Sequence, residues 1–194
     1  MNILIDVLPE SVTVDGEEYE IRTDFRTSML FELLMQDNEV KPQDKTKKAL
    51  KLYYPVIPAN INEAVEAILW FYRCGKEDNP QRQKMNAKKG KTRVYSFEYD
   101  DDYIYAAFMT QYGIDLQDIE YLHWWKFQSL FRSLNSSNKI VEIMSYRTTD
   151  ISQIKSKTEQ ARIARLQKLY EIPHAMTREE KIAHAGAAFG GGLF

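Results

Sequence analysis

Two adjacent tryptophans, Trp124 and Trp125, are the feature that most constrains the fold of this chain. They lie in a run of residues with helical periodicity, and adjacent residues of a helix point about 100° apart. A single narrow apolar stripe therefore buries one indole ring and leaves the other exposed. Both rings are covered only if packing partners approach the helix from two sides or if a second protein binds it. The pair predicts dense packing or assembly, and it is not a sign of catalysis.

The spacing of apolar residues predicts a mainly α fold, a helical bundle-like protein with an N-terminal β-hairpin. Alternation of Ile3, Ile5 and Val7 predicts that extended structure begins at the N-terminus. Asp15-Gly16 then separates further alternating apolar residues, and this dipeptide favours a hairpin because a type I′ turn needs positive φ at both positions. After the hairpin the period becomes helical, with helices expected over residues 25–34, 45–52, 60–72, 100–112, 115–134, 140–147 and 151–169.

Local signals mark several helix ends. Asn60 is a candidate N-cap, and Glu63 follows it at the spacing of a capping box. The acidic residues 100–102 fit a helix N-terminus, where the helix dipole stabilises negative charge. Gly113 is expected to end that helix in the left-handed conformation.

Composition divides the chain into four segments. Residues 1–75 combine the hairpin with helices, and residues 94–170 form a helical domain that contains the two tryptophans. Residues 76–93 read as a basic linker, and residues 171–194 read as a flexible C-terminal tail with three consecutive glycines near its end. The two larger segments either form separate units or share one core.

Composition and charge argue against several classes of protein. A formal net charge of −2 and a pI near 6.0 do not suit a protein whose whole surface binds nucleic acid or anionic lipid. No apolar segment approaches the roughly 20 residues that cross a bilayer. The single Cys74 cannot close an intramolecular disulfide, and the first residues lack a secretion signal. We therefore expect a cytoplasmic protein that does not insert into a membrane.

The residues that carry most enzyme chemistry are scattered. His123, His174 and His184 lie far apart in the sequence, and none belongs to a metal-binding motif. Cys74 has no histidine nearby in the sequence. We therefore expect no enzyme activity, no catalytic residue, no metal site and no cofactor.

The basic linker is the candidate site for nucleic acid. Tyr95 and Phe97 follow it, and aromatic rings beside basic residues are the combination that binds single strands. Charge runs between helices are more often solvated loops, and the near-neutral remainder of the chain would not strengthen the attraction. Nucleic acid is thus the less favoured partner, with these candidate phosphate contacts: Arg82, Lys84, Lys88, Lys89, Lys91 and Arg93.

Apolar residues in two regions are candidates for a protein interface. Those in the tryptophan block either fill the core, with His123 hydrogen-bonded, or include an interface anchor, since tryptophan often supplies much of the binding energy. Those in the tail lie in a segment too short for a core, so they either dock on a neighbour or form a loose terminus. The candidates are Trp124, Trp125, Phe127, Ile182, Phe189, Leu193 and Phe194.

Several sequence blocks resemble the bacteriophage Gp15 family of tailed phages that infect Gram-positive bacteria. The order of the blocks matches the family as well as their content, and the resemblance weakens in the basic linker and in the tail. In chain order the blocks are Asp24-Phe25-Arg26, Tyr103-Ile104-Tyr105-Ala106-Ala107-Phe108, Tyr112-Gly113-Ile114-Asp115-Leu116, Leu122-His123-Trp124-Trp125-Lys126-Phe127 and Ser145-Tyr146-Arg147.

The resemblance implies a virion-assembly protein that acts as a tail assembly chaperone in the host bacterial cytoplasm. Chaperones of this kind coat the phage tape-measure protein, recruit tail-tube protein and leave before the tail is complete. They have no known chemistry, and the family has no established catalytic motif. Self-association is a further expectation. Two alternatives remain open: a structural tail component retained in the virion, and a nucleic-acid-binding phage regulator.

Overall fold

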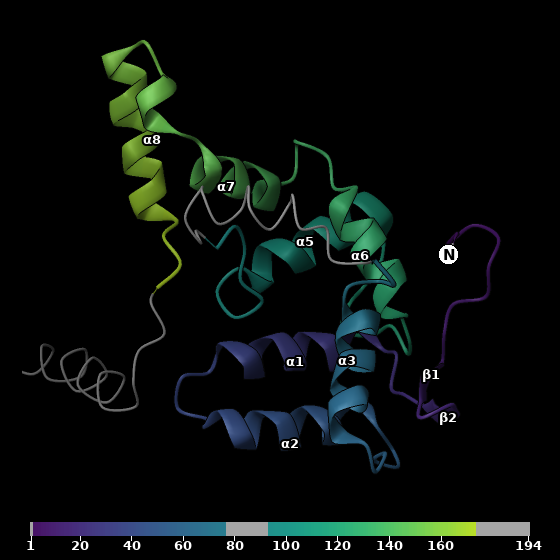
Figure 1. Ribbon diagram of the computed structural model, residues 1–194. Coiled ribbons are helices and arrows are strands. Elements are labelled where there is room, and N and C mark those ends of the chain that lie inside the picture. The colour runs from purple at the N-terminus through teal and green to yellow at the C-terminus, as the bar shows by residue number, and fades with distance from the viewer. Residues whose placement is uncertain (1, 77–92, 174–194) are drawn as a thin grey trace, which may run out of the picture.

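A computed structural model describes residues 2–76 and 93–173 of the chain (Figure 1). In these residues the fold is mainly α with an N-terminal hairpin, as the sequence predicts. The hairpin consists of β1 (Ser11–Val14) and β2 (Glu17–Glu20). The helices are α1 (Phe25–Gln36), α2 (Pro42–Tyr53), α3 (Ile61–Tyr72), α5 (Asp101–Tyr112), α6 (Trp124–Arg132), α7 (Lys139–Thr148), the 3₁₀ helix η1 (Ile151–Gln153) and α8 (Lys157–Leu169).

The hairpin turn has the geometry that Asp15-Gly16 predicts. The φ angles are 52° at Asp15 and 80° at Gly16, and β1 pairs with β2 in antiparallel register. The turn is fixed to the start of α3, because the Asp15 backbone N–H donates to Glu63 Oε2 at 2.9 Å. Asn60 Oδ1 accepts from the Glu63 N–H at 3.3 Å, which confirms Asn60 as the N-cap of α3.

The expected strand at residues 3–7 is not formed. The backbone N–H groups of Ile5 and Asp6 both donate to the Asn2 carbonyl, so this segment turns instead of extending. A strand needs a partner for its backbone groups, and none of the described residues pairs with the segment. Alternation alone therefore gave a wrong prediction here.

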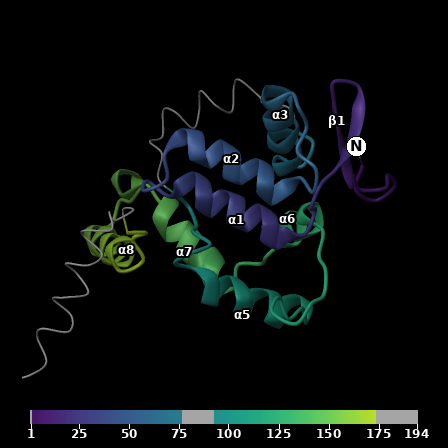
Figure 2. The same ribbon diagram turned by 90° about the horizontal axis from the view of Figure 1, so that it is seen from below.

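The helices form two layers (Figure 1). In one layer α1 and α2 lie side by side, with α3 packed against α2 and β1. In the other layer α5 packs against α7, and α6 joins the layers through its contact with α1. Helix α8 contacts α7, and both views place it at the end of the molecule opposite the hairpin (Figures 1 and 2).

One expected helix is shorter than predicted. The sequence predicts a helix over residues 115–134, but α6 begins only at Trp124. Asp115 Oδ1 accepts from the N–H groups of Gln117 and Asp118, which stabilises a turn at the start of the expected helix. The backbone before Trp124 is also held in a β-bridge between Asp24 and His123. Long-range pairing has thus replaced the first turns of the expected helix.

The last expected helix is also divided. Residues 151–169 form η1 followed by α8, and Ser156 caps α8 by accepting from the Glu159 N–H. By contrast, the end of α5 follows the prediction, since Gly113 takes the left-handed conformation with φ 66°.

Buried residues from both halves of the chain form one hydrophobic cluster. The ring of Phe127 is near its centre and stacks on Phe25 from the first half, on Phe108 and on Trp124, with ring centroids 4.9 to 5.7 Å apart. The cluster includes Val12, Val14, Phe31, Tyr53, Ile68 and Phe71 from the first half and Phe97, Ile104, Leu116, Phe131 and Ile140 from the second. The halves therefore share a core, the second of the two arrangements that the sequence allows, while the segment boundaries stay a prediction.

Candidate interaction surface

The two adjacent tryptophans both pack against the last turn of α3. Trp124 Nε1 donates to the Tyr72 carbonyl at 2.9 Å, and Trp125 Nε1 donates to the Phe71 carbonyl at 2.8 Å. These carbonyls lie at the end of α3, where the last turn lacks the regular donors of a continuing helix, and the Phe71 carbonyl also accepts from the Cys74 N–H. The Trp124 ring stacks on Tyr72, and the Trp125 ring is tilted against Phe71. Both indoles therefore bury their rings and donate hydrogen bonds to backbone carbonyls at the C-terminal end of α3.

Burial favours one of the two interpretations of the tryptophan block. The exposed fractions are 1% for Trp124, 5% for Trp125 and 0% for Phe127. These rings pack inside the folded chain, which is the core interpretation, and they leave almost no surface for a partner. The four other candidates, Ile182, Phe189, Leu193 and Phe194, lie outside the described residues and stay a prediction.

His123 positions the first turn of α6. The Trp125 backbone N–H donates to His123 Nδ1 at 3.1 Å, so Nδ1 is unprotonated and Nε2 carries the hydrogen. His123 Nε2 then donates to the Pro9 carbonyl at 3.1 Å. Burial lowers the pKa of His123, and the neutral ring is the form that accepts from Trp125. The histidine is a helix cap, and it ties the N-terminal segment to the core.

The starts of α1 and α6 are joined by their backbones. The Phe25 N–H donates to the Leu122 carbonyl at 2.9 Å, and the Trp124 N–H donates to the Thr23 carbonyl at 2.8 Å. Asp24 caps α1 through the Arg26 N–H and also accepts from the Leu122 N–H. The structure therefore brings together two blocks of the sequence, 24–26 and 122–127, that both indicate the family.

A buried ion pair holds the start of α5 against the end of α7. Arg147 donates to both carboxylate oxygens of Asp100, at 2.6 and 2.9 Å, and the side chains are only 6% and 2% exposed. Arg147 also donates to the carbonyls of Val94 and Tyr170. The sequence predicts Asp100 only as a charge at a helix N-terminus, and the ion pair adds a stronger reason for an acid at this position.

The most exposed large apolar side chains of the described residues lie near the N-terminus. We define residues 2–9 as the N-terminal arm. In the arm Leu4 is 90% exposed, Ile5 is 80% exposed and Val7 is 89% exposed. Figure 1 shows the arm rising from the hairpin along one side of the molecule, apart from the helices. Three large aliphatic side chains within four residues at this exposure are costly in water, which makes the arm the main candidate for binding a partner.

The exposed tryptophan is Trp70, which is not among the residues predicted from the sequence to form an interface. Its ring is 39% exposed and lies edge-on to Trp125 with centroids 5.6 Å apart. The helical period of the sequence could have predicted this exposure. Phe71 occupies the buried face of α3, so the adjacent Trp70 points to a different side of the helix. Val56 and Ile57, in the loop that follows α2, are also exposed.

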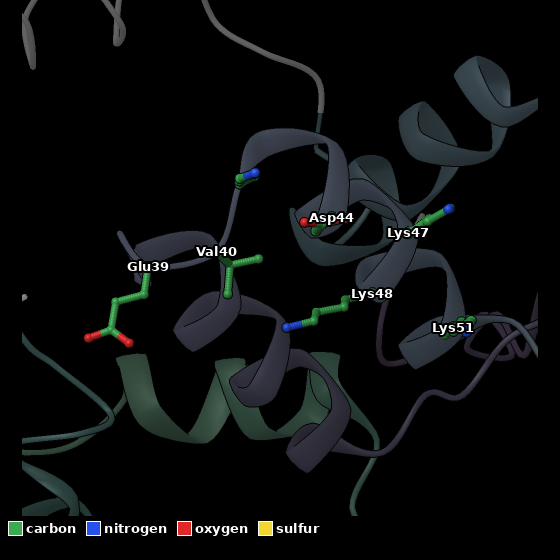
Figure 3. A pocket seen from close by; sticks show the side chains of 7 residues that line it. Glu39, Val40, Asp44, Lys47, Lys48 and Lys51 are labelled. Atoms are coloured by element: carbon green, nitrogen blue, oxygen red, sulfur yellow. The ribbon is translucent and has the colours of Figure 1, made fainter. Parts of the chain in front are cut away.

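Lysines surround a shallow hollow at α2, with Lys47 and Lys48 pointing to different sides of the helix (Figure 3). Lys41, Lys47, Lys48 and Lys51 line a shallow hollow of about 370 Å³ together with Glu39, Val40 and Asp44. The hollow is open to solvent, and its charged side chains are exposed. We call these four lysines the lysine face.

The described part of the basic linker does not support nucleic-acid stacking. Arg93 donates to Gln36 Oε1 and to Ser96 Oγ, which directs its side chain toward α1. Phe97 is buried, and Tyr95 packs edge-on to Phe131 in the core. The other candidate phosphate contacts, Arg82, Lys84, Lys88, Lys89 and Lys91, lie outside the described residues.

These observations define a mainly α protein whose aromatic residues join its own helices and whose arm leaves apolar surface uncovered. The sequence profile of the family described as Bacteriophage Gp15 protein matches residues 4–172, and the chain belongs to this family. It is therefore a phage protein of the structural, tail-related class, from a family not known for enzyme activity. The resemblance seen in the sequence is confirmed.

The remaining comparisons add no further relative. Searches of curated proteins and of solved structures found no match to the chain. Within residues 2–76 and 93–173, no group of three His, Cys, Asp or Glu side chains is placed to hold a metal ion. No helix in the same residues has the length and apolar character needed to span a membrane.

Proposed function

We propose that this protein is a tail assembly chaperone, which binds the phage tape-measure protein and the tail-tube protein non-covalently during tail morphogenesis. It would act in the host bacterial cytoplasm, before the tail is complete. The proposal involves no catalytic residue and no cofactor. It rests on membership of the phage family together with the apolar surface that the fold leaves uncovered.

The exposed N-terminal arm is the observation that carries the proposal. A chaperone for a long helical protein must cover apolar side chains on that protein until assembly, and it must offer apolar side chains to do so. Leu4, Ile5 and Val7 are available without unfolding the core, whereas Trp124 and Trp125 are not. The family match also begins at residue 4, so it includes the apolar part of the arm, while residues 182–194 lie beyond its end.

The size of the arm suits reversible binding. Full burial of an aliphatic side chain contributes about 1.5–3 kcal/mol. Ordering an interface side chain costs about 0.5–1.5 kcal/mol, and association itself carries a further entropic cost. Three aliphatic residues therefore strengthen a complex without making it permanent. A chaperone that leaves before the tail is complete needs this balance.

Co-expression with the tape-measure protein tests the proposal. We expect the native chain to co-purify with the tape-measure protein, and we expect the variant Leu4→Ser/Ile5→Ser/Val7→Ser to lose it. The matched control is Val56→Ser/Ile57→Ser, which changes exposed apolar residues in a different loop and should still co-purify. If the native chain captures neither the tape-measure protein nor the tail-tube protein, the chaperone proposal fails.

Mass spectrometry of mature particles separates the chaperone from a structural tail component. A chaperone should be absent from particles or present in trace amounts, and a tail component should be present at a fixed copy number. The nucleic-acid alternative is tested by a gel-shift assay with DNA and RNA at low salt, where binding through phosphates would be strongest.

A further inference from the structure

Acidic and basic side chains are segregated into two segments of this molecule, which meet where Arg22, just after the hairpin, donates to the carbonyls of Lys51 and Leu52. The hairpin segment, residues 9–21, contains five carboxylates and no Lys or Arg. The segment that contains α2, residues 40–52, contains five lysines and one aspartate. The net charge of the whole chain is only −2, so the charges are segregated rather than in excess.

Neither charged surface is neutralised inside the described part of the chain. None of the ion pairs formed there includes a hairpin carboxylate or a lysine of the lysine face. The remaining lysine of α2, Lys45, donates to the Met35 carbonyl and lies closer to the body of the protein. Both charged surfaces are therefore free to meet a partner of opposite charge.

The spacing of the two sets of charges is compatible. Glu18 and Glu20 are two residues apart on β2 and so lie on one side of the strand, about 7 Å apart. Their cross-strand neighbours are Thr13 and Ser11, which makes this outward side polar. Lys47 and Lys51 are four residues apart on α2, which places them on one helix face with a rise of about 6 Å.

We propose that this chain self-associates, with the hairpin carboxylates of one copy docked on the lysine face of a second copy. Glu18 and Glu20 pair with Lys47 and Lys51 across the contact. Because exposed ion pairs are weak and screened by salt, the association is reversible and depends on ionic strength.

A second copy is favoured over an unrelated basic or acidic protein because one chain supplies both complementary charges. A copy with a free hairpin and a free lysine face has two binding surfaces, so the same contact can extend to further copies unless it closes around a symmetry axis. Such a contact would let several copies line up on one long partner. The self-association itself needs no tape-measure protein.

Sedimentation velocity of the purified full chain tests the proposal directly. We expect species larger than the monomer at about 0.05 M salt and a shift toward monomer at about 0.5 M, where the Debye length is much shorter. The variants Glu18→Lys/Glu20→Lys and Lys47→Glu/Lys51→Glu should each associate at least about tenfold more weakly, because each brings like charges together. A native chain that is monomeric at low salt would overturn the proposal.

Mixing the two variants gives the decisive result. The reversed hairpin of one variant is complementary to the reversed α2 of the other, so the mixture should regain association that neither variant shows alone. The control Lys157→Glu/Arg165→Glu reverses two exposed charges on α8 and should associate like the native chain. If the mixture associates no better than the separate variants, the proposed contact is wrong. Only this chain is present, so the result is independent of the chaperone proposal.

Discussion

Replacing Arg147 with alanine removes one member of the buried ion pair between α7 and the start of α5. Asp100 would keep its charge at a position where its side chain is only 2% exposed, and the carbonyls of Val94 and Tyr170 would lose a donor. Removing one partner of a buried ion pair typically costs about 3–5 kcal/mol, because the other charge is left uncompensated. We expect a loss of this size in the free energy of unfolding.

Chemical denaturation followed by circular dichroism measures this loss. For a protein of this size about 1 kcal/mol corresponds to roughly 2–4 °C, so the melting temperature should fall by roughly 6–20 °C. The comparison is Asp100→Asn/Arg147→Met, which removes both charges and keeps an oxygen to accept from the Ser96 N–H. The double variant should be more stable than Arg147→Ala alone. A loss below about 1 kcal/mol for Arg147→Ala would show that the pair behaves like an exposed one, and the reasoning would be refuted.

Two further predictions concern the tryptophan block. Gly75→Ala should destabilise the fold more than Gly113→Ala: both glycines have φ near +67° and share the strain of a left-handed alanine, but only at Gly75 would the new Cβ lie 2.8 Å from the Trp125 ring; melting temperatures of both variants check this. Burial lowers the pKa of His123 from its usual 6.5, so the unfolded chain takes up a proton that the folded chain excludes, and stability should fall as the pH drops below about 6.5, by at most about 1.4 kcal/mol per pH unit. Asn can still cap the helix and does not titrate, so His123→Asn should lose this part of the pH dependence when both proteins are denatured at about pH 7.5 and 5.5.

Local chemistry allowed much of the fold to be predicted from the sequence. Asp15-Gly16 specified the hairpin turn, and Asn60 and Gly113 marked helix ends, because each acts on backbone groups within a few residues. The errors arose where distant segments meet. The expected helix at 115–134 loses its first turns to the bridge between Asp24 and His123, which no local pattern reveals.

The site was harder to predict than the fold. The geometry of a helix shows that Trp124 and Trp125 need cover on two sides, but it cannot show that Phe71 and Tyr72 of α3 pack against the two rings and accept their N–H groups. Likewise the sequence could not pair Asp100 with Arg147, which are far apart along the chain. Residues that resembled the family most clearly turned out to hold the helices together.

The exposed surface also escaped the sequence pattern. Alternation at the N-terminus is the same for a paired strand and for an unpaired arm, and only the absence of a partner strand among the described residues distinguishes them. The segregation of charge between the hairpin and α2 was present in the composition of those segments. The segregation indicated a binding surface only once the fold showed that neither the hairpin carboxylates nor the lysines of the lysine face form ion pairs within the described residues.

The central claim is that the tryptophan block maintains the fold while the N-terminal arm binds the partner. Calorimetric titration of the tape-measure protein with the Leu4→Ser/Ile5→Ser/Val7→Ser variant tests this most directly, with the melting temperature measured on the same sample. We predict a melting temperature close to that of the native chain, because the three side chains are exposed, together with a loss of binding. Native-like binding by a folded arm variant would contradict the account.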